Sequence, residues 1–175
     1  MLLGLAYPLA VTGLSQWLFP KKANGSLITR DGRVIGSELI GQTFLSDEYF
    51  HARPSSAGDG YDAANSSGSN LAPTNHALVE RVKSDVAKLR AENPGALVPI
   101  DLVTASGSGL DPDVSPAAAY FQIPRIARAR NVSQDSLRSL IARHTEARQF
   151  GVFGEPRVNV LRLNLDLDST FPGKK

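Results

Sequence analysis

Hydrophobic and polar positions along this chain repeat with two different periods, which predict both helices and strands. The clearest helical pattern covers residues 76–92, where apolar side chains fall on one stripe of an amphipathic helix. The stripe consists of Leu78, Val82, Val86 and Leu89. Thr74 or Asn75 is expected to cap the start of this helix, and the Asn-Pro-Gly sequence at 93–95 is expected to end it.

Two further helical segments are predicted in the second half of the chain. Residues 116–130 follow Ser115, a typical N-cap residue, and Pro124 is expected to kink or divide this helix because proline has no N–H group to donate. Ser133 is expected to cap a third helix that continues past His144. Its apolar positions at i, i+3 and i+4 are Leu137, Leu140 and Ile141.

Strand patterns occur in three places. Asp-Gly at 31–32 separates the strand-like runs 26–30 and 33–35, which predicts a β-hairpin. The short apolar run 97–103 predicts a buried strand, and the alternation over 158–168 predicts a strand with one buried face. The alternating apolar residues are Leu161, Leu163, Leu165 and Leu167. Strands and helices in this order predict an α+β fold.

The first 20 residues contain no charged side chain and are mostly apolar. Their length is at the lower limit for a membrane-spanning helix. We therefore predict a transmembrane helix over 1–20 and one soluble α+β domain over 21–175, the alternative for 1–20 being a buried helix of a soluble protein. By the positive-inside rule, the charges of Lys21 and Lys22, counted alone, predict that the domain that follows lies in the cytoplasm.

Composition excludes several classes of function. The formal net charge is +2 over 175 residues, so binding of nucleic acid by bulk electrostatics is not expected. The chain has no cysteine, which excludes disulfides, thiol catalysis and thiolate metal sites.

Two similar loops rich in serine and glycine stand out, one at 67–73 and the other at 106–112. Each is expected to lead into the N-terminus of a helix, where exposed N–H groups favour anionic or carbonyl groups. Gly107 and Gly109 are expected to have positive φ angles. The alternative is a pair of tight turns that bind no ligand.

Known catalytic motifs are missing from the chain. It contains no Walker-type phosphate loop and no HExxH motif, and its three histidines are far apart in sequence. A serine nucleophile remains an alternative, with Ser106 or Ser108 attacking, His144 as the base and Asp111 orienting it.

Polar residues that interrupt apolar contexts, together with the two loops, are the candidate subunit-contact or functional residues. These are Gln42, Arg53, Ser67, Ser69, Asn70, Asn75, Ser106, Gly107, Ser108, Gly109, Asp111, Gln122 and Arg125. The alternative is structural: these side chains pair with one another and hold the loops in place.

Several motifs together resemble one known family across essentially the whole chain. They lie at 23–28, 40–42 with Phe44, 49–55, 67–71, 103–112, 122–127 and 158–161. The chain resembles the C subunit of the bacterial Kdp potassium-transporting P-type ATPase. Members of this family usually begin with more residues, including a basic lead, so the resemblance implies that this chain begins inside the membrane helix.

The resemblance implies a non-catalytic subunit of a four-part pump. Its partners would be a channel-like subunit that carries potassium, a P-type ATPase subunit that uses ATP, a small single-span subunit and membrane lipid, with no nucleic acid. The Asp-Lys-Thr-Gly-Thr phosphorylation motif of P-type pumps is missing from this chain. Such C subunits are described as catalytic chaperones that raise the ATP affinity of the ATPase subunit, and they are associated with ATP binding.

The same family is placed in the bacterial inner membrane, as a single-pass protein with an extracytoplasmic soluble domain. Because ATP is cytoplasmic, this location favours a stabilising role in assembly over direct nucleotide contact, and no directly bound cofactor is expected. Two alternatives from other classes remain. One is a membrane-anchored extracytoplasmic serine hydrolase, and the other is a module that binds a small polar ligand.

Overall fold

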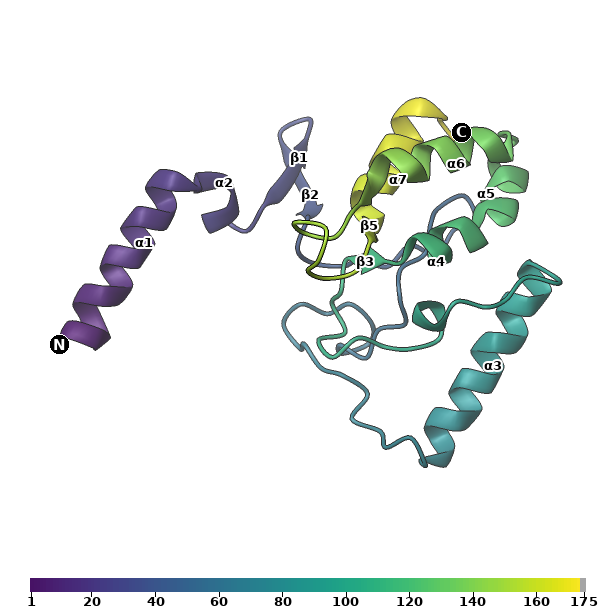
Figure 1. Ribbon diagram of the computed structural model, residues 1–175, viewed down its shortest axis with the longest axis horizontal. Helices are drawn as coiled ribbons and strands as arrows, with labels where there is room; N and C mark the ends of the chain where they lie inside the picture. Colours follow the sequence, from purple (N-terminus) through teal and green to yellow (C-terminus); the bar gives the residue numbers. More distant parts are fainter. Residues whose placement is uncertain (174–175) are drawn as a thin grey trace. The chain divides into compact units, whose positions relative to one another are not determined.

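The computed structural model describes residues 1–173, and the chain divides into two compact units (Figure 1). The first unit is Met1–Ile40 and the second is Gly41–Lys175. The division that the sequence suggested after residue 20 stays a prediction.

The first unit consists of three short helices and a β-hairpin. The elements are the π-helical turn η1 (Leu2–Ala6), α1 (Tyr7–Leu18), α2 (Pro20–Ala23), β1 (Leu27–Arg30) and β2 (Arg33–Ser37). The hairpin confirms the prediction from Asp-Gly: Asp31 and Gly32 both have positive φ, at 51° and 75°.

The expected transmembrane helix over residues 1–20 is not supported. The longest helix in this stretch is α1, with 12 residues, and it ends where Phe19 leaves the helical conformation and Pro20 follows. Nowhere in residues 1–173 does a helix have both the length and the apolar character that crossing a membrane requires.

The second unit is an α+β domain, which confirms the predicted fold class. Its elements are α3 (His76–Glu92), the 3₁₀ turn η2 (Ile100–Leu102), β3 (Asp113–Val114), α4 (Pro116–Phe121), α5 (Ile123–Arg130), α6 (Gln134–His144), β4 (Thr145–Glu146), β5 (Arg157–Asn159) and α7 (Val160–Thr170). The three strands form a small antiparallel sheet in the order β3-β5-β4. Residues 41–75 run without a helix or strand.

The core of the second unit lies among α4, α5, α6, α7 and the small sheet, which gather together in Figure 1. Its fully buried side chains include Ile123, Ile126, Leu137, Leu140, Ile141, Val158, Leu163 and Leu167. Phe50 is also fully buried, although it belongs to the irregular segment. The helices therefore close their core around a stretch of chain that has no regular structure.

Three helix predictions are confirmed together with their caps, but the third helix does not continue past His144 as expected: α6 ends there, because Thr145 turns to an extended conformation and begins β4. Helix α3 covers 76–92 as expected, and the Asn75 side chain accepts a hydrogen bond from Ala77 N–H. Ser115 and Ser133 cap α4 and α6 in the same way. The predicted break near Pro124 is also present, because α4 and α5 are separated at Gln122.

Two strand predictions were wrong. Residues 97–103 form a loop and the 3₁₀ turn η2, and most of 158–168 is helix α7. Asn159 caps α7 by accepting a hydrogen bond from Arg162 N–H. The leucines of this segment also fit a helical stripe, since Val160, Leu163, Asn164 and Leu167 are buried at spacings of three and four residues.

Candidate functional site

Residues 47–51 run as irregular chain against the helices of the second unit and bury Phe50 in its core, so their backbone polar groups need partners from side chains. Buried polar side chains from the helices supply these partners. We call this group the clamp, and it consists of Gln122, Arg125, Arg130 and Asn164, each no more than 6% exposed.

Asn164, on α7, holds the backbone of Phe50. Its Oδ1 accepts a hydrogen bond from Phe50 N–H at 2.9 Å, and its Nδ2 donates to Phe50 O at 2.9 Å. The side-chain amide thereby takes the place that a neighbouring strand would occupy in a sheet.

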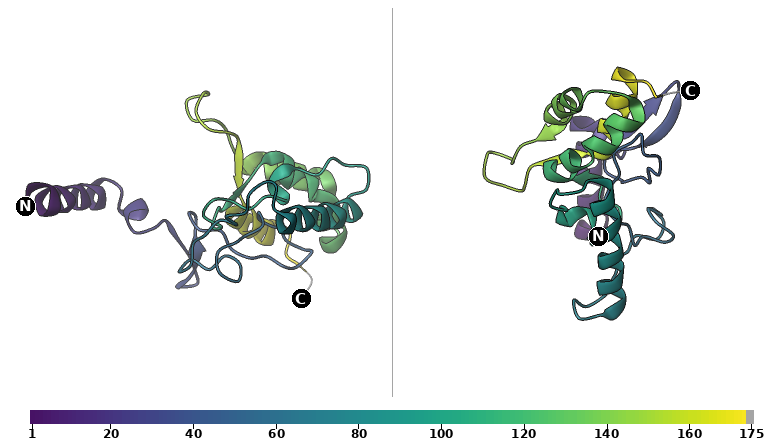
Figure 2. Two further views of the ribbon diagram at one scale, coloured as in Figure 1. Left: turned by 90° about the horizontal axis from the view of Figure 1, so that it is seen from below. Right: turned by 90° about the vertical axis from the view of Figure 1, so that its right-hand side faces the viewer.

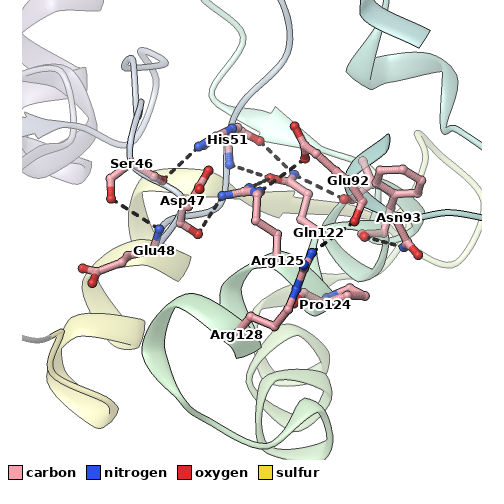
Figure 3. Close-up of polar contacts among 12 residues, drawn as sticks. Ser46, Asp47, Glu48, His51, Glu92, Asn93, Gln122, Pro124, Arg125 and Arg128 are labelled. Carbon is pink, nitrogen blue, oxygen red and sulfur yellow. Dashed lines mark hydrogen bonds and ion pairs between the residues drawn. The ribbon is translucent and has the colours of Figure 1, made fainter. Parts of the chain in front are cut away.

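Gln122 does the same for the next residue along the chain (Figure 3). Its Oε1 accepts from His51 N–H at 2.8 Å, and its Nε2 donates to His51 O at 3.1 Å. Gln122 can reach this backbone because it lies at the break between α4 and α5. The break next to Pro124 therefore positions the amide.

Arg125, on α5, joins the clamp to α3 (Figure 3). It donates from Nη1 to Asp47 O at 2.8 Å and from Nη2 to Gln122 Oε1 at 2.7 Å. Its Nε forms an ion pair with Glu92 Oε2 at 3.4 Å, but has no hydrogen-bond partner among the described residues. Burial lowers the pKa of Arg125, while Glu92 and Asp47 act in the opposite direction.

Arg130, at the end of α5, completes the clamp. It donates to Glu48 O, to Phe171 O and to Asp168 Oδ1, each at 2.7 Å. Its guanidinium carbon also lies 4.8 Å from the centre of the Tyr49 ring, within the range of a cation–π contact. The buried charge of Arg130 is thus paired on several sides, as burial requires.

His51 points back along the irregular segment, with Nε2 at 3.0 Å from Ser46 O (Figure 3). Burial, and then the charge of Arg125, lower the pKa of His51 below its ordinary value of 6.5. The unfolded chain therefore binds a proton at a higher pH than the folded chain does.

This difference predicts how stability depends on pH. As the pH falls from about 7 to about 5, unfolding takes up protons at His51, so the free energy of unfolding should decrease. Urea unfolding of the full chain at several pH values in this range checks the slope. His51→Gln should show a flatter dependence, whereas the exposed-site control His76→Gln should keep the original slope. Equal slopes for the original chain and His51→Gln would contradict the prediction.

The two serine- and glycine-rich loops lie against each other. Ser67 N–H and Ser66 Oγ both donate to Ser108 O, at 3.0 Å each. Ser55 Oγ donates to Gly109 O at 2.6 Å. Gly109 has a φ of +67°, which confirms the expectation for this residue, but the expectation for Gly107 was wrong because its φ is not positive.

An ion pair holds the base of these loops. Arg53 Nη1 lies 2.9 Å from Asp111 Oδ2, and Tyr61 Oη donates to Arg53 O at 2.6 Å. Burial raises the pKa of Tyr61 to about 12, with Asp111 acting in the same direction. This phenol therefore stays neutral and keeps its hydrogen bond at physiological pH.

The structure brings some of the candidate residues together and leaves others in separate places. Gln122 and Arg125 meet in the clamp, while the loops gather Arg53, Ser67, Ser106, Gly107, Ser108, Gly109 and Asp111. Ser69 and Gln42 are half-buried, Asn70 is exposed with a φ of 50°, and Asn75 caps α3. The helices after the loops are capped by Asn75 and Ser115, whose side chains occupy N–H groups that an anion would need.

The serine-nucleophile arrangement does not form. Asp111 pairs with Arg53, whereas His144 Nε2 lies 2.8 Å from Asp166 Oδ2. Ser108 Oγ accepts a hydrogen bond from Leu110 N–H at 3.1 Å. None of the contacts in residues 1–173 joins a serine of this loop to a histidine, so the nucleophile has no base.

Two surface cavities flank the clamp on the side of α3. One, of about 230 Å³, is lined by His51, Ala52, Arg53, Pro54, Asp85, Lys88, Leu89, Glu92, Leu102 and Gln122. The other, of about 490 Å³, is lined by Asp47, Ala91, Glu92, Arg125, Arg128 and Ala129. Acidic and basic residues mix in both linings, so neither cavity selects a ligand of one charge. Within residues 1–173 no group of three metal-ligating side chains is suited to an ion.

Sequence reasoning missed two members of the clamp. Asn164 is the only amide among the alternating leucines of 161–167, and this interruption is the signal that could have found it. Arg130 gave no local signal, because its partners Glu48 and Asp168 are far away along the chain.

Comparison with known proteins gives one consistent result. The family model described as "KdpC: K+-transporting ATPase, c chain" matches residues 1–169. The potassium-transporting ATPase KdpC subunit of Acidobacterium capsulatum is 65% identical over 167 residues, which are 95% of this chain and 89% of that protein. The KdpC subunit of Koribacter versatilis is 59% identical over 172 residues, 98% of this chain and 89% of that protein. That of Methylorubrum extorquens is 63% identical over 176 residues, 94% of this chain and 88% of that protein.

Proposed function

The chain belongs to the KdpC family, the c chain of the K+-transporting ATPase, and from this premise we propose that it is a non-catalytic subunit that stabilises the assembled pump. We further propose that it acts as a catalytic chaperone, which raises the affinity of the ATPase subunit for ATP without hydrolysing ATP itself.

The clamp is the observation that best supports a structural role. Its buried side chains form their hydrogen bonds with the backbone of residues 47–51, with one another and with neighbouring acidic groups. Gln122 and Arg125 also line the two surface cavities, but amide and guanidinium groups supply neither a nucleophile nor a general base. The arrangement is suited to keeping an irregular surface rigid, and a rigid surface loses little conformational entropy when it docks.

The proposed partners are the other parts of the pump: the potassium-channel-like subunit, the P-type ATPase subunit and the small single-span subunit. We propose a location at the bacterial plasma membrane, with the second unit outside the cytoplasm. Large apolar side chains at Leu2, Leu3, Leu9, Trp17 and Phe19 are exposed in the first unit. Exposure of this extent supports contact between residues 1–19 and an apolar environment, either lipid or the membrane-embedded subunits.

A comparison of the purified pump with and without this chain tests the proposal. With the chain present, the KM for ATP should be lower, by about fivefold or more if the coupling between subunits is of ordinary strength. Adding the purified chain back should restore the lower KM, and the chain alone should show no ATPase activity. An unchanged KM, or ATP hydrolysis by the chain alone, would contradict the proposal.

A further inference from the structure

The loop between β4 and β5 ends in a cluster of exposed apolar side chains. Phe150, Val152 and Phe153 are 86%, 69% and 66% exposed. We call these three residues the aromatic tip. Both views in Figure 2 show this loop, in yellow-green, projecting away from the helices of its own unit. Other large apolar residues exposed in the second unit, such as Leu97, are not part of this cluster.

The aromatic tip stands on an ordered turn. Gln149 and Phe153 exchange both backbone hydrogen bonds, at 2.8 and 2.9 Å, and Gly151 N–H donates to Arg148 O at 3.0 Å. Below the turn, Arg148 donates to both carboxylate oxygens of Glu155, at 2.7 and 2.6 Å. These contacts order the backbone of the turn that carries the tip, and an ordered segment loses less entropy when it binds.

Phe150 has an unfavourable backbone conformation for its type. Its φ is 54°, in the left-handed region, where asparagine and glycine are common and bulky residues are rare. Its side chain is exposed, so packing within this chain does not compensate for the strain. Residues held in this way concentrate at functional sites.

We infer that the aromatic tip inserts into an apolar pocket of another protein subunit of the potassium-transporting ATPase. This inference rests on the proposed function. An aromatic side chain on a rigid turn is typical of the central residues that supply most of the affinity at a protein interface. Phe150 and Phe153 are the anchors, and the polar base of the loop forms the rim.

The charges at the base of the loop favour a protein over lipid. Arg148 pairs with Glu155, and Arg157 pairs with Glu146. Asp113 also pairs with Arg157, and Arg162 with Glu146, so three acidic and three basic residues cancel and the base of the loop carries no net charge. Attraction to an anionic membrane surface depends on basic residues whose charge is not neutralised, and here all three arginines are paired.

Phe150→Asn tests the inference in the full chain. Asparagine suits the left-handed conformation, so urea unfolding should show unchanged or higher stability. The affinity of the chain for the rest of the purified pump should fall by about tenfold or more, because an anchor is lost. Leu97→Asn is the matched control: Leu97 is 93% exposed but lies outside the tip, so its variant should keep the original affinity. Unchanged affinity for Phe150→Asn, or an equal loss for both variants, would overturn the inference.

A photocrosslink identifies the occupant directly. With benzoyl-phenylalanine at position 150, irradiation of membranes that contain the whole pump should join this chain to another pump subunit. A crosslink to lipid, to a second copy of this chain or to nothing would overturn the inference. If the original chain does not bind the pump, the proposed function itself fails. If the original chain and Phe150→Asn both bind equally well, only the inference about the aromatic tip fails.

Discussion

Replacement of Asn164 with leucine should lower the free energy of unfolding by about 2–6 kcal/mol. Leucine has the branching of asparagine but is bulkier, so the loss of hydrogen bonds is accompanied by some overpacking in the core around position 164. The N–H and C=O groups of Phe50 would stay buried without partners, and each such group costs about 1–3 kcal/mol. This loss is a large part of the total stability of an ordinary domain, which is about 5–15 kcal/mol.

Urea unfolding of the full chain, followed by circular dichroism, measures this effect. Gln134→Leu is the matched control, because it removes an exposed amide at the start of α6 and should change stability by no more than about 0.5 kcal/mol. A similarly small change for Asn164→Leu would show that the amide does not hold the segment. Asn164→Leu should also reduce assembly of the chain with the rest of the pump, since residues 47–51 would no longer be held rigid.

The parts of this fold that sequence could predict are those set by local chemistry. Asn75, Ser115 and Ser133 cap helices because a short polar side chain can reach an N–H two or three residues ahead. Asp31-Gly32 makes a hairpin because both residues tolerate positive φ. In each case the atoms that decide the structure lie within a few residues of one another.

The strand predicted over 158–168 failed because its pattern is ambiguous. Leucine at every second position fits a strand, but with a buried Asn164 it also fits a helix whose stripe includes an amide. The amide fits the buried stripe of the helix because it hydrogen-bonds to Phe50, 114 residues away. A pattern within one segment carries no information about such a partner.

The same limit applies to the candidate site. The sequence singled out Arg53, Asp111 and Gln122 as polar residues in apolar contexts, and the alternative that they are structural was already open. The sequence could not show which residues these side chains bond to, because Arg53 and Asp111 are 58 residues apart along the chain and Gln122 is 71 residues from His51. Residue type predicted that hydrogen bonds would be needed, but only the fold determines which atoms supply them.

Gly109→Ala should have a second large effect, a loss of about 2–5 kcal/mol of stability. A Cβ at position 109 would lie 2.5 Å from Ser67 O and 2.7 Å from Ala57 N. Both are backbone atoms and cannot rotate away, so the paired loops would have to separate. Overpacking of this kind costs about 1–3 kcal/mol. The φ of +67° adds about 1–2 kcal/mol for any residue with a Cβ.

Gly107→Ala provides the control for this prediction within the same loop. Position 107 has no positive φ, and a Cβ there would meet no atom within 4 Å, so stability should change by no more than about 1 kcal/mol in either direction. Urea unfolding measures the difference in stability between the two variants. Pump assembly should follow stability, so Gly109→Ala should assemble with the pump less well than Gly107→Ala. If instead Gly109→Ala were as stable as Gly107→Ala, the two loops could not be packed as closely as the contact between Ser67 and Ser108 requires. If both variants were stable and only Gly109→Ala failed to assemble, the loop would act as a docking surface in its own right and would not be needed for the stability of the domain.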